Sequence, residues 1–204
     1  MPSRSPVLQN FLTALDQALL ARPTGPDESV AVDRIRSALQ TTGKASKDAA
    51  QRLPVCRYLP DALATARTGS AVVAGVADAF AALEPALIWN KRSSGGPNAS
   101  STWPEGHANT MIAGPKGLED RDDLWIGATL LAPHVRYPDH NHAPEEVYLV
   151  LSPGRFQHGD SGWFEPGVGG TLYNVPNITH AMASDAAPLF AIWSLWAGEG
   201  KTTK

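Results

Sequence analysis

Apolar side chains recur every three or four residues in the first third of the chain. The first helix-like stretch places its apolar positions on one stripe, and these are Leu8, Phe11, Leu12, Leu15 and Leu19. Such spacing predicts an amphipathic helix, and Ser5 followed by Pro6 is a typical helix start. The same pattern predicts further helices over residues 27–39, 46–52, 60–65 and 70–83. The first third is therefore predicted to be helical.

From Leu87 onward, short apolar runs alternate with turns rich in glycine and proline. The predicted strands cover residues 87–89, 109–113, 124–131, 146–151, 156–158, 171–174 and 189–196. Short, closely spaced strands favour an all-β sandwich or barrel over alternating βαβ units. Residues 93–101 are rich in turn formers. They are interpreted either as a mobile lid or as a plain connection.

The predicted organisation is a helical N-terminal extension over residues 1–85, packed on a β-barrel over residues 86–200, with a tail at 201–204. A chain of 204 residues suits one domain with an appendage. The net charge of −3 argues against nucleic-acid binding, because a basic stripe would be needed to displace counterions. The chain is expected to act as a monomer or homodimer.

The compartment is inferred from what the sequence does not contain. No apolar run is long enough to cross a bilayer, and polar residues interrupt the N-terminus where a leader would need an apolar stretch. The single cysteine, Cys56, excludes an intramolecular disulfide and fits a reducing compartment. We therefore expect a cytoplasmic protein without a membrane partner.

Histidines and a carboxylate gather around residues 140–148. His140 and His142 are two positions apart and share one face if the chain is extended, while Glu146 and Tyr148 share a face after the bend at Pro144. His180 ends a second turn-rich stretch. Imidazole and carboxylate ligands suit Zn, Fe or Mn better than Ca or Mg. One histidine alone is more often a surface or core residue, but together the four residues predict a metal site.

Three other histidines, His107, His134 and His158, fit no ligand spacing and are interpreted as surface residues.

Two stretches, residues 137–154 and 169–180, resemble the paired motifs of the cupin superfamily. The first motif is matched at His140, His142 and Glu146, and the second at Gly169 and His180. The chain departs from the pattern at five points: the closing glycine of the first motif comes late, as Gly154, and other residues stand for the opening glycine (His134), a proline (Val175), a glycine (Asn177) and the final asparagine (Ser184). The resemblance implies a double-stranded β-helix, or jelly-roll, barrel that holds one divalent transition-metal ion. The fold class is thus expected to be mainly β.

A closer resemblance is to DddQ-type dimethylsulfoniopropionate (DMSP) lyases, through Tyr137, His140-Asn-His142, Glu146-Val-Tyr148 and His180. It implies metal ligands at His140, His142, Glu146 and His180, and cleavage of DMSP to dimethyl sulfide and acrylate. The family assigns the role of base to the tyrosine matched by Tyr148. Tyr137 is given a positioning or secondary acid–base role.

The chemistry of this elimination agrees with such residues. A carbon acid beside a carboxylate is weak, and a metal bound to that carboxylate relieves the build-up of negative charge. The zwitterionic substrate also carries a sulfonium, which an aromatic face can hold; the aromatic candidates are Trp193, Trp196, Trp125 and Tyr173. Strand alternation prevents Trp193 and Trp196 from both facing inward. Lys91, Arg92 and Lys116 are interpreted as surface charges.

Two other functions fit the same motifs. One is a cupin dioxygenase or isomerase with bound Fe or Mn. The other is a non-catalytic cupin that binds a small molecule.

Overall fold

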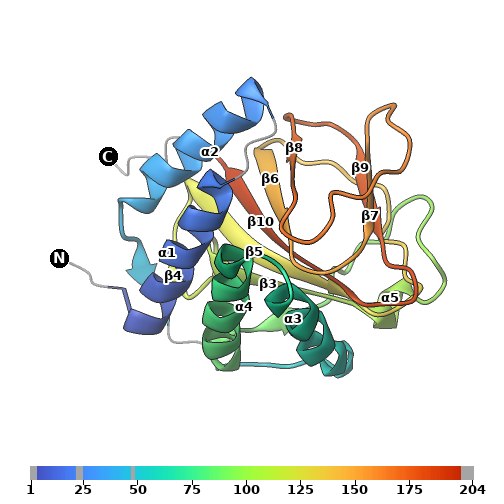
Figure 1. Ribbon diagram of the computed structural model, residues 1–204, viewed down its shortest axis with the longest axis horizontal. Helices are drawn as coiled ribbons and strands as arrows, with labels where there is room; N and C mark the ends of the chain where they lie inside the picture. The colour runs from blue at the N-terminus through green and yellow to red at the C-terminus, as the bar shows by residue number, and fades with distance from the viewer. Residues whose placement is uncertain (1–3, 22–24, 47–48, 199–204) are drawn as a thin grey trace.

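Two β-sheets and a layer of helices make up the computed structural model, which describes residues 4–21, 25–46 and 49–198. The helices cover one face of a large sheet, and a small two-stranded sheet lies on the other side (Figure 1). This arrangement confirms the mainly β barrel with a helical N-terminal part. The predicted tail at 201–204 lies outside the described residues.

The helices are α1 (Pro6–Leu20), α2 (Pro26–Leu39), α3 (Leu59–Arg67), α4 (Ala71–Leu83) and α5 (Trp103–Gly106), with short 3-10 turns η1 (Pro54–Tyr58) and η2 (Glu84–Ala86). Ser5 and Ser70 cap α1 and α4, since their hydroxyls accept hydrogen bonds from Leu8 N (3.3 Å) and Val73 N (3.4 Å). Residues 47 and 48 lie outside the described residues, and the described remainder of the helix predicted at 46–52 is not helical, so that prediction is wrong there. Gln51 instead bridges Ile88 in extended backbone, so its hydrogen bonds go to a neighbouring chain segment.

The large sheet has the order β1-β4-β3-β5-β10-β6-β8, with β2 also paired to β3, and β7 pairs with β9 in the small sheet. The strands are β1 (Lys44–Ala45), β2 (Trp89–Asn90), β3 (His107–Ala113), β4 (Glu119–Asp120), β5 (Leu124–Leu131), β6 (Glu145–Val150), β7 (Arg155–His158), β8 (Thr171–Asn174), β9 (His180–Ala183) and β10 (Leu189–Trp196). The predictions for β5, β8 and β10 are confirmed to the residue. Strand β9 was not predicted, because its His-Ala-Met-Ala run has little β propensity.

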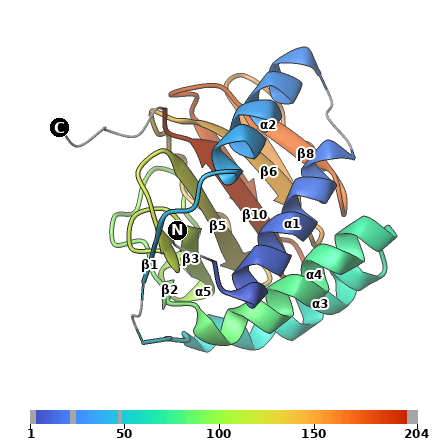
Figure 2. The same cartoon turned by 90° about the vertical axis from the view of Figure 1, so that its left-hand side faces the viewer.

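Helices and sheet share one hydrophobic core. Phe80 of α4 packs edge-on against Phe11 of α1, Trp89 of β2 and Phe190 of β10, with ring centroids 5.8, 6.2 and 4.8 Å away. In Figure 2 the helices α1 and α2 lie in front of the large sheet, and α3 and α4 run along its lower side. Strand β1, from the first 85 residues, also pairs into that sheet. The domain boundary at residue 85 stays a prediction. Among the described residues, the helical part before it and the barrel after it contribute side chains to the same hydrophobic core.

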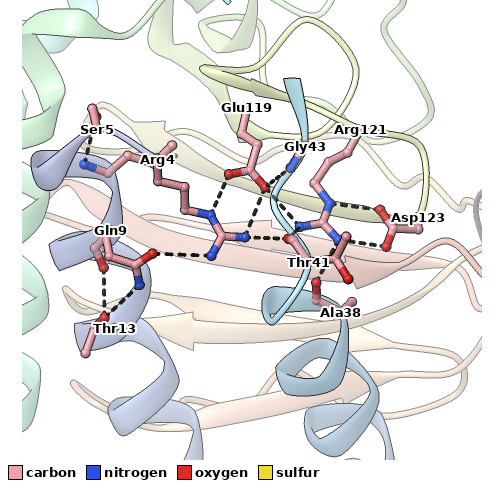
Figure 3. Close-up of polar contacts among 11 residues, drawn as sticks. Arg4, Ser5, Gln9, Thr13, Ala38, Thr41, Gly43, Glu119, Arg121 and Asp123 are labelled. Carbon is pink, nitrogen blue, oxygen red and sulfur yellow. Dashed lines mark hydrogen bonds and ion pairs between the residues drawn. The ribbon is translucent and has the colours of Figure 1, made fainter. Parts of the chain in front are cut away.

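A buried ionic network ties the start of α1 to the barrel (Figure 3). Arg4 Nε donates to Glu119 Oε2 at 2.5 Å, and Arg121 Nη1 donates to Glu119 Oε1 at 3.0 Å. Both arginines also donate to the carbonyl of Thr41, and Gly43 N donates to Glu119 Oε1. Glu119 is only 2% exposed. Because a buried charge needs a partner, the two guanidinium groups that contact it balance its charge. The network holds α1, β4 and the connection after α2 together.

No helix in the described part of the chain is long and apolar enough to span a membrane.

Candidate metal centre and active site

A cavity of about 200 Å³ lies on the face of the large sheet that the helices do not cover. The pairing register decides which side chains reach it: Glu146 and Tyr148 of β6 lie opposite Leu195 and Trp193 of β10. Because paired residues of neighbouring strands share a face, all four line the cavity. Tyr137, from the segment after β5, completes this part of the wall.

Three predicted ligands meet at one end of this cavity. Glu146 Oε2 lies 3.2 Å from His142 Nε2 and 3.3 Å from His180 Nε2, and these ligand atoms all lie within 4.8 Å of one another. His180 is brought there by β9, which meets residue 140 through two backbone hydrogen bonds of 2.9 and 3.1 Å. The fourth predicted ligand, His140, packs against His180 with ring centroids 4.1 Å apart and an interplanar angle of 54°, but lies outside that group.

The tautomers of the three imidazoles follow from their hydrogen bonds. Nδ1 of His140, His142 and His180 lies 2.9–3.0 Å from the carbonyl oxygens of Pro138, Pro144 and Ile178 respectively. A carbonyl can only accept, so each Nδ1 carries a hydrogen. In the neutral ring each Nε2 then carries a free lone pair. This is the orientation of a metal-ligating histidine, with its second nitrogen held by an outer partner.

The charges also fit a cation. Among the described residues, buried His180 Nε2 has no hydrogen-bond partner although it faces the Glu146 carboxylate. A bare lone pair facing a carboxylate is unfavourable unless a proton or a metal ion lies between them. Two imidazole nitrogens and a carboxylate oxygen are ligands that Zn, Fe and Mn accept. The residues present therefore fit a divalent transition-metal ion.

Burial and the Glu146 charge set the protonation of this cluster. Burial lowers the pKa of His140 to about 3, with the neighbouring His180 adding to the effect. Burial also lowers the pKa of His180. For His142, burial acts downward, but the hydrogen bond and charge of Glu146 outweigh it and raise the pKa. His140 and His180 thus favour the neutral form that can bind a metal.

Glu146 is held by a residue that the sequence did not single out. Asn174 Nδ2 donates to Glu146 Oε2 at 3.1 Å, and Asn174 Oδ1 lies 2.9 Å from His158 Nδ1. Asn174 lies opposite Glu146 in the β6–β8 pairing. The interpretation of His158 as a surface residue is wrong: it is partly buried, because its ring braces the amide that orients Glu146.

The interpretation of His107 as a surface residue is also wrong, because this side chain is fully buried. Its Nδ1 donates to Trp103 O at 2.6 Å, and its Nε2 accepts from Arg92 N at 2.9 Å. This fixes a neutral ring in the core, and burial lowers its pKa. His134 is exposed, as predicted. Asn177 has φ of 62°, which explains how asparagine replaces the glycine of the second motif.

The two tyrosines of the site differ in their partners. Tyr148 is 2% exposed, and burial followed by the Glu146 charge raises its pKa well above 10. Tyr137 Oη accepts a hydrogen bond from Asn109 Nδ2 at 2.9 Å. Burial raises the pKa of Tyr137 as well, but the Asn109 bond and the nearby Arg92 act against that rise. Both rings line the cavity.

The aromatic candidates separate by face. Trp193 and Trp125 line the cavity. Trp196 instead lies under the Arg34 guanidinium of α2 at 5.1 Å, and Tyr173 donates to Glu145 Oε2 at 2.7 Å. Their assignment as substrate contacts is therefore corrected, because strand alternation turns both toward the helices.

Arg92, interpreted as a surface charge, is half-buried and lines the cavity. Lys116 is exposed and Lys91 pairs with Glu105, as expected of surface charges.

The loop at 93–101 lies against the segment that carries Tyr137. Asp139 N donates to Pro97 O at 3.0 Å, and Asn98 Nδ2 donates to Asp139 Oδ2 at 2.7 Å. Gly96 packs so closely that a Cβ there would lie 2.7 Å from Asp139 O. The proposed lid is thus joined to the wall of the site, and its movement stays a prediction.

A jelly-roll barrel that gathers two histidines and a glutamate beside a cavity defines a cupin with a candidate metal site. Residues 27–191 match the family model of dimethylsulfoniopropionate lyases, so this chain belongs to that family. A protein of Cereibacter sphaeroides named as a candidate DMSP lyase, DddL, is 27% identical over 146 residues. That match covers 71% of this chain and 60% of DddL.

Solved structures share the fold over nearly the whole chain. The crystal structure of DMSP lyase DddQ from Ruegeria pomeroyi DSS-3 has a TM-score of 0.76 at 19% identity, covering 98% of this chain and 95% of that one. A structure from the work on DMSP lyases RdDddP and RnDddQII has a TM-score of 0.70 at 21% identity, covering 97% and 95%.

Proposed function

We propose that this chain cleaves DMSP to dimethyl sulfide and acrylate by a metal-dependent β-elimination. The carrying observation is that His142 and Glu146, which form a cluster with His180, line the same cavity as two phenols, Tyr148 and Tyr137. Membership of the DMSP lyase family supports the proposal. The small cavity, about 200 Å³, suits a metabolite of few atoms better than a drug-sized ligand.

His142, Glu146 and His180 would hold one divalent transition-metal ion, with His140 as a fourth donor. When bound, the ion supplies Lewis-acid stabilisation of negative charge at the substrate carboxylate. Zn, Fe and Mn all accept this ligand set, so the donors leave the metal open within that group. The neutral imidazoles, with each Nδ1 held by a carbonyl, are already turned for this role.

Tyr148 acts as the base. Its phenolate oxygen takes the α-proton, the C–H electron pair forms the new double bond, and the Cβ–S pair leaves with neutral dimethyl sulfide. A phenol with a pKa near 10 must lose about 4 kcal/mol of proton affinity to act near neutral pH. Burial and Glu146 raise the Tyr148 pKa further. Tyr148 can therefore act as the base only if the negative charge of Glu146 is neutralised, which a bound divalent cation would do.

The sulfonium end of the substrate is held by the faces of Trp193 and Trp125. Both line the cavity, and indole faces attract soft cations without requiring a hydrogen bond. Tyr137 positions the substrate or serves as a second acid–base group.

The proposal is tested with purified, metal-loaded protein and DMSP. We expect dimethyl sulfide in the headspace and acrylate in solution in equal amounts. Tyr148→Phe should lower kcat by at least about 100-fold while metal content stays unchanged, because only the base is removed. Tyr58→Phe, on the 3-10 turn η1 away from the cavity, is the matched control.

Two results would contradict the proposal. Oxygen uptake without sulfide release would indicate the dioxygenase alternative. Full activity of the Tyr148→Phe protein would remove Tyr148 as the base.

A further inference from the structure

A chain of hydrogen bonds crosses the cavity wall and ends at Tyr137. Trp193 Nε1 donates to Thr129 Oγ1 at 3.2 Å, and Thr129 Oγ1 donates to Asn109 Oδ1 at 2.7 Å. Asn109 Nδ2 then donates to Tyr137 Oη at 2.9 Å. The four residues come from β10, β5, β3 and the segment after β5. All four line the cavity.

The sheet register builds this chain. Asn109 and Thr129 are direct partners in the β3–β5 pairing, and Trp193 lies opposite Gly127 in the β5–β10 pairing. A Cβ at position 127 would lie 2.2 Å from the Trp193 ring. Glycine therefore lets the indole lie against β5, where its nitrogen reaches Thr129, two residues further along the same face.

The direction of each bond follows from its chemistry. An indole nitrogen only donates, so Thr129 Oγ1 must accept from Trp193 and point its own hydrogen at Asn109. The Asn109 atom that faces Thr129 must accept this hydrogen, so it is the amide oxygen, Oδ1. The amide nitrogen must then face Tyr137 and donate to its oxygen. Tyr137 Oη is consequently an acceptor within the protein, and its hydroxyl hydrogen is free to point into the cavity.

The Tyr137 ring has little freedom to turn away. It is 4% exposed, and Trp103 and His107 pack against it with interplanar angles of 87° and 90°. Trp103 and His107 stack on each other with centroids 4.2 Å apart. The ring is thus held by packing, while its hydroxyl direction is set by Asn109.

We propose that Asn109 is a positioning residue that aims the Tyr137 hydroxyl at a carboxylate oxygen of the substrate, with Thr129 and Trp193 fixing the Asn109 amide. This inference rests on the proposed function, because it names the group that Tyr137 binds. Among the described residues that line the cavity, Arg92 is the cation, and its charge favours the same carboxylate. Trp193 thereby acquires a second role beside holding the sulfonium.

Asn109→Asp tests this geometry at nearly constant side-chain size. An aspartate accepts from both Thr129 and Tyr137, so the Tyr137 hydrogen turns into the protein and away from the substrate. We expect kcat/KM for DMSP to fall about tenfold, the effect of one hydrogen bond to a charged group. Asn90→Asp is the matched control, since Asn90 is the partner of Asn109 on β2 but is exposed and lies outside the cavity.

A double-mutant cycle separates positioning from a general structural effect. If Asn109 acts through the Tyr137 hydroxyl, Asn109→Asp should cause no further loss in a Tyr137→Phe protein. An equal tenfold loss in both backgrounds, or no loss in either, would overturn the proposal. Should Asn109→Asp fail to fold, Thr129→Val serves instead, because it removes the donor that fixes the amide. The same non-additivity with Tyr137→Phe is expected.

A binding measurement distinguishes a failure of the lyase proposal from a failure of the role proposed for Asn109. Propionate, a carboxylate without a sulfonium, is titrated into the metal-loaded proteins by calorimetry. We expect Asn109→Asp and Tyr137→Phe to weaken its affinity by the same factor of about ten. If they do but no dimethyl sulfide is formed from DMSP, the lyase proposal fails and the role of Asn109 stands. If sulfide is formed and propionate affinity is unchanged in Asn109→Asp, the role of Asn109 is wrong.

Discussion

Each histidine of the cluster has its ring orientation set by its own stretch of chain. The carbonyls that fix His140, His142 and His180 lie two residues away along the chain in every case. The rings are therefore turned before any ligand arrives, at the small entropic cost of a local contact. Glu146 differs, because its orientation depends on Asn174 from another strand.

Asn174 is predicted to tune metal affinity. Asn174→Leu keeps the approximate size of the side chain but removes the donor to Glu146 Oε2, so the carboxylate loses its outer partner. We expect metal affinity to fall 10- to 100-fold, as measured by competition with a chelating dye. Tyr173→Phe is the control, since the neighbouring side chain faces the helices. Equal affinity of the Asn174→Leu and native proteins would contradict the prediction.

Alternation within one strand could be predicted from the sequence, while pairing between strands could not. Parity placed Glu146 and Tyr148 on one face and separated Trp193 from Trp196, and the structure agrees with both. The roles of Asn109 and Asn174 depend on partners 20 and 28 residues away in the chain. Such partners follow from register, which a single sequence does not specify.

The misassigned residues share the same cause. Arg92, His107 and His158 carry polar groups that suggest solvent, yet the Arg92–His107 and His158–Asn174 hydrogen bonds join residues 15 and 16 positions apart in the chain. The helices and most strands were predicted because their signals are local.

The ionic network that joins α1 to β4 is predicted to depend on pH. Burial acts to raise the pKa of Glu119, but Arg4, the Gly43 N–H and Arg121 outweigh it, so the folded-state pKa lies below 4.5. A carboxyl with a lowered pKa stabilises the fold above its unfolded pKa, and that contribution is lost as pH falls through the folded value. The stabilisation should therefore be complete at pH 7 and decline below about pH 4.5.

Glu119→Gln measures this contribution. Removing one charge from a buried network leaves Arg4 and Arg121 without their shared partner, so we expect a loss of about 3 kcal/mol at pH 7. The difference in Tm between the native and variant proteins should narrow as the pH is lowered from 5 to 3. Asp185→Asn, in an exposed pair with Arg155, should change Tm little at either pH. A constant difference across this range would contradict the assignment to Glu119.

On the scale of the whole molecule, the fold and the metal cluster depend on different residues. The core joins the helices to one face of the large sheet, and the cluster lies on the other. The protein without metal should therefore stay folded, unlike a small domain that folds only around its ion.

Metal removal tests this separation. After treatment with EDTA we expect an unchanged far-UV circular dichroism spectrum, loss of lyase activity and a lower Tm. A ligand at 100 times its Kd stabilises by about 2.7 kcal/mol, which sets the scale of the shift. Adding back Zn, Fe(II) or Mn(II) should restore Tm. Unfolding on chelation would show that the cluster supports the fold.

The contact between Phe80 and Phe190 links positions 110 residues apart. The helices are synthesised before β10, so their apolar stripes leave the ribosome long before the strand that covers them exists. During that interval the nascent chain exposes surface on which chaperones act and aggregation starts. Folding of this protein is consequently completed only after translation of β10, and a ribosome stalled before residue 189 should present a helical segment open to proteolysis.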